Sequence, residues 1–265
     1  MDFTKNIEEL EELGYTLLPR FIDRETTADI RRFIDAAIAN RQYSGAERGS
    51  STYHYRVCSP IDHPISAQLA SDRRILEVAT KSLRAENLRL RQQMFMLTTP
   101  CGEPPPSKPD GWHIDTPFTS TEWKATPSRI FSQFFYYCSP VKSGGAATMV
   151  IPASHKQTYR VADAMCGTEE GYREFAGNVR ELAQIDLSQA QEVVVDEGDV
   201  LIFNPMTLHS GSKNVTDTPR YAFHCSFYDQ CSEKVRNLPR PTFYDIFSEN
   251  MIAQMPPDLL PLLER

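Results

Sequence analysis

The sequence predicts a mainly β fold, an antiparallel sandwich or barrel with flanking helices. After Asn87, short segments rich in β-branched and aromatic residues are separated by Gly, Pro, Asn and Asp, which is typical of such folds. The chain has 19 prolines against 12 glycines, a balance that favours loops and strand ends over long helices. Its 265 residues are enough to bury a substantial core.

Residues 1–86 are expected to form a mainly helical support for this core. Apolar residues at helical spacing predict helices over 6–13, over the stretch that follows Asp23, and within 63–83. Gly14 is placed to end the first helix, and Asp23 is placed to cap the second. The segment YTLLPRF between them is interpreted as a short strand.

The β-core is expected over residues 87–231, within a single domain that covers 1–265. A charged segment of about 159–190 interrupts the core and is predicted to be helical, and the proline-punctuated tail 232–265 is expected to pack on the outside. The candidate strands of the core are LRLRQQMFML, WHIDT, RIFSQFFYYC, AATMVIP, QEVVVD, DVLIFN, LHSGS and RYAFHCSFYD.

Charge and composition narrow the class of partner. A formal net charge of −7 argues against a nucleic-acid-binding surface and against binding to anionic membranes. No run approaches the roughly 18 apolar residues of a membrane-spanning helix, and the start MDFTKNIEELEEL has no apolar signal segment. The six cysteines are scattered without a CxxC pair, which fits free thiols. We expect a cytoplasmic protein that acts on a small molecule, and the sequence does not predict its oligomeric state.

The stretch GWHIDTPF, residues 111–118, contains the first candidate site. His113 and Asp115 are two positions apart, so on a strand they would point to the same face. An imidazole and a carboxylate aimed at one point suit a metal ion. They equally suit an ordinary hydrogen-bonded pair, which is the commoner reading of an isolated HxD.

Two residues further along the chain favour the metal. His209, in NPMTLHSGS, supplies a third candidate ligand. Two histidines and one carboxylate form the facial triad of non-haem iron(II) oxygenases, which leaves three coordination positions open. Arg220, in TPRYAF, follows His209 by eleven positions near the start of the next predicted strand. Its guanidinium could bind a carboxylate in two-pronged fashion, as a dicarboxylic cosubstrate would require.

A further segment, SGGAATMVIPASHK at residues 143–156, completes a recognisable set. Together with the HxD, the distal histidine and the following arginine, it resembles the phytanoyl-CoA dioxygenase family of iron(II)- and 2-oxoglutarate-dependent oxygenases. That family typically shows a Gly-rich turn leading to a V/I-P-G-S-H-K segment, and this chain has Ala153 in place of the glycine. The resemblance runs over about residues 93–228.

The resemblance implies a double-stranded β-helix, or jelly roll, with iron(II) at one mouth. In this sequence, His113, Asp115 and His209 match the metal ligands of the family. Arg220 matches the residue that pairs with the C5 carboxylate of 2-oxoglutarate. The implied activity is hydroxylation of an unactivated C–H bond with O2, with release of succinate and CO2.

Two more positions are implied to bind the cosubstrate. Thr148 matches a threonine that contacts it in some members, and Gln93 lies where relatives often have a polar residue facing it. The lysine that many relatives carry six residues after Gln93 is replaced by Thr99. How the second end of the cosubstrate is held is therefore not predicted.

Other functions stay open at this point. Desaturation, epoxidation or ring formation would use the same site, whereas Asp115 disfavours halogenation because related halogenases lack the carboxylate. An inert metal-binding jelly-roll protein and a zinc-dependent, cupin-like isomerase or hydrolase are the alternatives from other classes. Arg220 disfavours both, since neither needs an anchor for a dicarboxylate.

The substrate itself is not predicted. Loops over 43–60, 100–128 and 160–190 are expected to shape its pocket. Within them, Phe118 and Trp123 are candidate substrate-binding residues, although aromatic side chains beside a strand are also common in the core.

Overall fold

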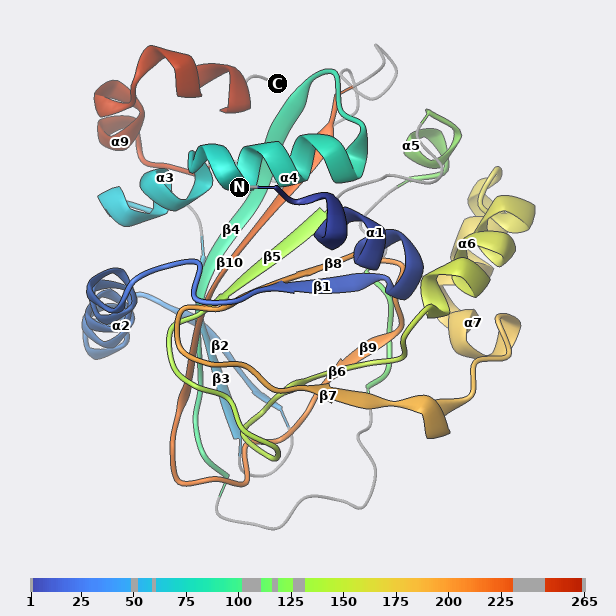
Figure 1. Cartoon of the computed structure of the whole chain (residues 1–265), viewed down its shortest axis with the longest axis horizontal. Coiled ribbons are helices and arrows are strands. Elements are labelled where there is room, and N and C mark those ends of the chain that lie inside the picture. The colour runs from blue at the N-terminus through green and yellow to red at the C-terminus, as the bar shows by residue number, and fades with distance from the viewer. Residues whose placement is uncertain are drawn as a thin grey trace.

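Two antiparallel sheets face each other in the computed structural model, and helices cover the outer side of the larger one (Figure 1). The sheets are joined by a shared apolar layer in which Tyr137, Leu201 and Phe203 of the large sheet pack against Val150 and Val193 of the small one. This double-sheet arrangement confirms the predicted jelly roll. The residues that the structure describes are 2–48, 52–58, 61–101, 111–115, 119–125, 132–230 and 246–263.

The large sheet has seven strands in the order β1-β8-β5-β10-β4-β3-β2, and all their pairings are antiparallel. The small sheet has three, in the order β7-β6-β9. The large sheet consists of β1 (Tyr15–Leu18), β2 (Ser44–Arg48), β3 (Thr52–Cys58), β4 (Leu88–Thr98), β5 (Ser132–Tyr137), β8 (Val200–Phe203) and β10 (Arg220–Asp229). The small sheet consists of β6 (Thr148–Val150), β7 (Gln191–Val193) and β9 (His209–Gly211).

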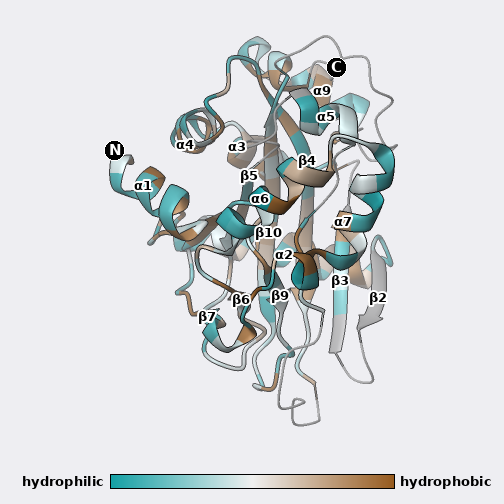
Figure 2. Ribbon diagram, turned by 90° about the vertical axis from the view of Figure 1, so that its right-hand side faces the viewer, coloured by the Kyte–Doolittle hydropathy of each residue, from teal (hydrophilic) through white to brown (hydrophobic). Residues whose placement is uncertain are grey.

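Helices α2, α3 and α4 bury their apolar sides against the large sheet. Ile30 and Ile34 of α2 and Val78 of α4 are fully buried beside Phe95 and Phe223 of the sheet. In Figure 2, α1 and α7 show hydrophilic stretches on the outside of the molecule. None of the helices in the described ranges is long and apolar enough to cross a membrane. The helices are α1 (Thr4–Leu13), α2 (Arg24–Ala39), α3 (Pro64–Ala70), α4 (Arg73–Leu83), α5 (Ser120–Ala125), α6 (Ser154–Met165), α7 (Glu169–Leu182) and α9 (Glu249–Gln254), with 3-10 turns η1 (Leu187–Gln189) and η3 (Pro257–Leu263).

The central strand β10 separates the two sides of the large sheet. Phe223, Cys225 and Phe227 alternate along it and join the core under the helices. Arg220 and His224 point to the opposite side, where the small sheet lies, and line a cavity. Successive side chains of a strand face opposite ways, so one strand supplies both the core and the cavity.

A β-bulge in β4 changes which side chains reach this cavity. Opposite β10, Ser226 pairs with Gln92 and Phe227 pairs with Leu90, so Arg91 is an extra residue. As a result, Arg91 and Gln92 both line the cavity, while Leu90 stays in the core. Bulges commonly redirect a side chain in this way.

The turn after α1 depends on Gly14. Its φ of 82° is left-handed, and it ends the helix as predicted. A Cβ there would lie 2.3 Å from Oγ1 of Thr207, which itself donates a hydrogen bond to the Gly14 carbonyl. Only glycine allows this approach, which holds the segment leading into β9 against the end of α1.

The structure differs from the sequence predictions in three segments. Strands β2 and β3 lie within 44–58, where no strand was predicted. WHIDT forms no strand among its described residues; it contributes a single bridge, between His113 and His209. The expectation that the tail packs outside is wrong for Ile246 and Phe247, which are each 4% exposed and belong to the main core.

Glu197 links α2 to the turn before β8. Its carboxylate accepts hydrogen bonds from Thr27 Oγ1 and Arg31 Nη1, each at 2.5 Å, and Arg31 also donates to the carbonyl of Cys138. Burial opposes ionisation of this carboxylate, but the two hydrogen bonds hold the pKa of Glu197 below its ordinary value. The ionised form is therefore stabilised in the folded state.

We expect Glu197→Gln to lower the free energy of unfolding at neutral pH by about 1–3 kcal/mol, the range for a charge-assisted hydrogen bond. Because the folded-state pKa is depressed, this contribution is present above the unfolded-state pKa of about 4.3 and disappears as the pH falls through the folded value. Urea unfolding of both proteins between neutral and acidic pH measures it. A difference that stays constant at acidic pH would contradict the assignment.

Candidate metal centre

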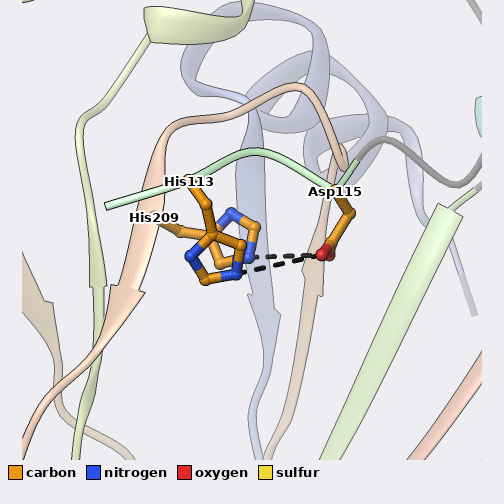
Figure 3. A group of neighbouring side chains, drawn as sticks. All are labelled: His113, Asp115 and His209. Carbon is orange, nitrogen blue, oxygen red and sulfur yellow. Dashed lines mark ion pairs between the residues drawn. The ribbon is translucent and has the colours of Figure 1, made fainter. Parts of the chain in front are cut away.

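A pair of backbone hydrogen bonds brings the two predicted histidines together. The amide of His113 donates to the carbonyl of His209, and the amide of His209 donates back, both at 2.9 Å. Strand β9 then continues from His209, while Asp115 is held by a bond from its amide to the carbonyl of Pro205. As a result, the three side chains gather at one point (Figure 3).

The orientation of each ring is set by a carbonyl oxygen. Nδ1 of His113 lies 2.7 Å from the carbonyl of Gly111, and Nδ1 of His209 lies 2.8 Å from the carbonyl of Thr207. Since a carbonyl can only accept, each Nδ1 carries the proton and each Nε2 presents a lone pair. This is the tautomer that a metal ligand needs.

Asp115 completes the group. Its carboxylate oxygens lie 3.9 Å from Nε2 of His113 and 3.5 Å from Nε2 of His209. One donor atom from each of the three residues falls within 4.8 Å of the others. Burial opposes ionisation, but His209 and a hydrogen bond from Gln133 hold the pKa of Asp115 below its ordinary value. The site therefore offers one anionic oxygen donor and two imidazole nitrogen donors, which fits a divalent iron.

Gln133 and His224 form a buried chain of hydrogen bonds that ends on Asp115. The amide nitrogen of Gln133 donates to Oδ2 of Asp115, and its oxygen lies 2.8 Å from Nε2 of His224. Burial lowers the pKa of His224 to about 3, so the ring is neutral. Its Nε2 is the donor because the Gln133 oxygen can only accept. One oxygen of Asp115 is thus occupied by the amide, and the other is left for a metal.

The triad opens into a cavity of about 620 Å³ between the two sheets. Its size falls within the range of small-molecule sites, about 300–1,000 Å³. Apolar side chains of Met94, Met96, Phe135 and Phe203 line the cavity together with its polar groups, and the ring of Phe203 lies 4.9 Å from that of His209. A small molecule could therefore lie beside the three donors and contact apolar side chains at the same time.

Arg220 and Thr148 lie in the wall of this cavity. Arg220 is 8% exposed and donates from Nη1 to the carbonyl of Ala146 at 2.5 Å, while its Nε has no hydrogen-bond partner. Burial lowers the pKa of Arg220, against the influence of nearby Tyr137, but a guanidinium stays charged at neutral pH. Thr148 Oγ1 lies 2.9 Å from the hydroxyl of Tyr137. The guanidinium of Arg220 and the hydroxyl groups of Thr148 and Tyr137 thus lie near one another, at the end of the cavity where β10 begins.

Two other predicted site residues, Gln93 and Trp123, do not line this cavity, and a third is not among the described residues. Gln93 faces the helices, where its side-chain amide donates to the carbonyl of Ser66 at 2.9 Å, because it alternates with the cavity-facing Gln92 and Met94. Trp123 is 3% exposed and belongs to a separate apolar cluster around α6 and α7, so it is corrected to a core residue. Phe118 lies outside the described residues.

The sequence analysis assigned no role to four further cavity residues, although one of them, Arg56, lies in the segment 43–60 that was expected to shape the pocket. Gln133 stands in the aromatic run SQFFYY, and His224 stands in the predicted strand RYAFHCSFYD, in neither case within a motif. Arg56 lies on β3, and Arg91 lies at the bulge in β4. Only the two-residue alternation of His224 with Arg220 along one strand was a usable signal.

Comparison with known proteins agrees with this geometry. The family model of phytanoyl-CoA dioxygenase matches residues 10–222. No curated protein sequence matches the chain. The fold is similar to the 2-oxoglutarate-dependent epimerase SnoN of nogalamycin biosynthesis, with a TM-score of 0.63, 18% identity and 89% of each chain covered.

Two further solved structures share the fold. HygX from Streptomyces hygroscopicus, with nickel and 2-oxoglutarate bound, has a TM-score of 0.56 and 15% identity over 87% of this chain and 88% of its own. EvdO2 from Micromonospora carbonacea var. aurantiaca, complexed with 2-oxoglutarate, has a TM-score of 0.55 and 15% identity over 94% and 98%. With its family model matched over most of the described chain, this protein belongs to the phytanoyl-CoA dioxygenase family.

Proposed function

We propose that the chain is a single-domain iron(II)- and 2-oxoglutarate-dependent oxygenase that hydroxylates an unactivated C–H bond of a small molecule. One observation carries this proposal: three metal-donor side chains and a buried arginine line the same cavity. Residues 1–86 would support the core of 87–231, and Ile246 and Phe247 of the tail would join this core on the helical side. An inert binding protein would not need both the donors and the buried guanidinium.

His113, Asp115 and His209 are the proposed iron ligands. They would supply three donors to the ion, and the hydrogen bond from Gln133 would leave Asp115 one oxygen for it, so that further coordination positions would stay open for cosubstrate and oxygen. With 2-oxoglutarate and O2 bound, iron(II) supplies the oxidation of a C–H bond, and succinate and CO2 are released. The protein holds the reactants in place and excludes water from them.

Arg220 and Thr148 are proposed to hold the far carboxylate of 2-oxoglutarate. Arg220 is buried and charged, and within the described chain no carboxylate lies within ion-pair distance of it. A charge in such a place needs an anionic partner. Thr148 can donate its hydroxyl to the same carboxylate, since the neighbouring Tyr137 hydroxyl can take either role in their shared hydrogen bond.

Hydroxylation is the proposed outcome, although enzymes with this fold differ in outcome. SnoN is described as an epimerase and SnoK, of the same biosynthesis, as a carbocyclase. A screen of small molecules for 2-oxoglutarate-dependent succinate formation, followed by mass spectrometry of the product, tests the proposal. Hydroxylation adds one oxygen atom to the substrate, epimerisation leaves its mass unchanged, and ring closure removes two hydrogen atoms. A product that lacks the added oxygen would replace hydroxylation by the matching alternative.

Replacing any one of the three proposed ligands by Ala should remove iron binding and 2-oxoglutarate turnover. We expect metal affinity and activity to fall more than about a hundredfold, because mutation of residues that only hydrogen-bond to metal ligands already costs about 10–100-fold. Metal content after dialysis and succinate formation measure the two effects, and circular dichroism reports the fold.

The matched control is His63→Asn. His63 caps α3 through a bond from the Ile65 amide and lies outside the cavity, and Asn can take over the cap. This variant should keep its metal and its activity. Full metal binding or full activity in any one of the three ligand variants would contradict the proposed site.

Arg220→Ala should weaken 2-oxoglutarate binding by roughly tenfold to a hundredfold, as the loss of a charge-assisted contact of about 1.5–3 kcal/mol requires. Arg220→Lys should recover only part, because an ammonium lacks the planar fork. Cosubstrate titration at fixed metal measures this, with the exposed Arg160→Lys of α6 as control. Unchanged affinity in Arg220→Ala would remove the main reason to name 2-oxoglutarate.

A further inference from the structure

His224 is joined to the metal centre through a single side chain, that of Gln133. The ring of His224 is 4% exposed and lies on the cavity side of β10. Its Nε2 lies 2.8 Å from the side-chain oxygen of Gln133, whose amide nitrogen donates a hydrogen bond to Asp115. The proposed chemistry uses Asp115 as a ligand but assigns no task to His224.

The pairing of β5 with β10 brings these two side chains together. Gln133 is opposite Ser226, two residues from His224, so Gln133 and His224 are diagonal neighbours on one face of the sheet. The ring of His224 packs against that of Phe135, with the ring centroids 4.6 Å apart. Among the described residues, Nδ1 of His224 has no hydrogen-bond partner. The bond to Gln133 is therefore the one hydrogen bond that this ring makes with the described part of the chain.

The direction of these hydrogen bonds is fixed from Asp115 outward. An ionised carboxylate can only accept, so the end of the Gln133 amide that faces it is the nitrogen. The amide oxygen then faces His224, and because this oxygen can also only accept, Nε2 carries the ring proton. A turn of the amide by 180° would break both bonds and place its oxygen against the carboxylate. His224 therefore opposes that turn.

The three ligands are held in different ways. The rings of His113 and His209 are oriented by backbone carbonyl groups, which belong to fixed segments of the chain. The carboxylate of Asp115 is instead oriented by a side chain, that of Gln133. Because a side-chain amide can rotate, its orientation needs a second contact to hold it, and His224 provides that contact.

We infer that His224 is a positioning residue for the metal centre. Its Nε2 proton holds the amide of Gln133 in one orientation, and this amide leaves one oxygen of Asp115 for the metal. His224 thus supports metal binding through another residue, as groups behind metal ligands do. The inference rests on the proposed function, since it takes the triad to be the iron site of the oxygenase.

The affinity of the metal-free protein for nickel(II), titrated at neutral pH without cosubstrate, tests this role. His224→Leu, which keeps a side chain of similar size but removes the donor, should weaken nickel(II) binding at least about tenfold. His224→Gln should recover most of the affinity, because its amide nitrogen can take the place of Nε2.

His224→Asn is the matched control for polarity. It keeps an amide, but its shorter side chain places the nitrogen near the position of Nδ1, so it should bind nickel(II) as weakly as His224→Leu. Circular dichroism checks the fold of each variant. His224→Asn keeps the test valid if His224→Leu does not fold.

A double variant separates positioning from packing. Gln133→Leu should weaken nickel(II) binding by about 10–100-fold. If His224 acts through Gln133, the addition of His224→Leu to Gln133→Leu should lower the affinity less than about threefold further, because the two residues then act as one unit. A double variant whose loss equals the product of the two single losses would overturn the inference.

Unchanged nickel(II) affinity in His224→Leu and His224→Asn would also overturn it, as would an equal loss in His224→Gln and His224→Leu. Titration of the nickel-loaded wild type with 2-oxoglutarate tests the proposed function separately. Coupled losses in a protein that binds no 2-oxoglutarate would uphold the role of His224 and reject the oxygenase. Binding of 2-oxoglutarate with independent losses would do the reverse, and a wild type that binds no nickel(II) would overturn both.

Discussion

The reciprocal backbone hydrogen bonds between His113 and His209 are the constraint on which the site depends. They join two segments that are far apart in the sequence and that no regular strand pairing would otherwise hold. His209 is also paired with Val150 of β6, so the bridge ties His113 to the small sheet. The triad is therefore positioned by the backbone, and its side chains add the chemistry without having to hold the segments together.

The two sides of the large sheet have different roles: one packs against helices in the apolar core, and the other lines the cavity. Helices α2, α3 and α4 cover one side, which frees the other to carry polar and charged residues in a protected space. The polar side chains there are costly to bury singly, and the structure links them: Gln133 hydrogen-bonds both to Asp115 and to Nε2 of His224. Because this amide has its orientation fixed at both ends, Asp115 has little freedom to rotate.

Much of the site was readable from the sequence because its signals are local. His113 and Asp115 are two residues apart, and His209 and Arg220 stand at fixed spacing in segments with clear strand patterns. The errors arose where a residue's side of the sheet had to be known. Gln93 is one position from the cavity side of β4, and only the pairing of three strands shows which side that is.

Other misses have equally physical causes. Trp123 follows Asp115 by only a few residues in the sequence. The apolar cluster that it joins, under α6 and α7, is nevertheless assembled from distant segments of the chain. TYHYRVC of β3 does alternate, with Tyr53, Tyr55 and Val57 separated by His54 and Arg56, and the sequence analysis overlooked this signal. SGAER of β2 has no such alternation and gains its place from pairing with β3, which in turn pairs with the distant β4. Long-range pairing of this kind leaves no trace in a local pattern.

The bulge at Arg91 inserts one extra residue into β4, so the alternation of its side chains shifts by one position there. Without a bulge, Leu90 and Gln92 would face the same side of the sheet because they are two residues apart. With the bulge, Leu90 faces the core and Gln92 faces the cavity. Deletion of Arg91 would remove the extra residue and leave Leu90 opposite Phe227 and Gln92 opposite Ser226, each on its present side of the sheet. The cavity would then lose one guanidinium group, although the neighbouring side chains of β4 kept their places. Change in the length of a strand is thus a route to new substrate chemistry that leaves the metal ligands untouched.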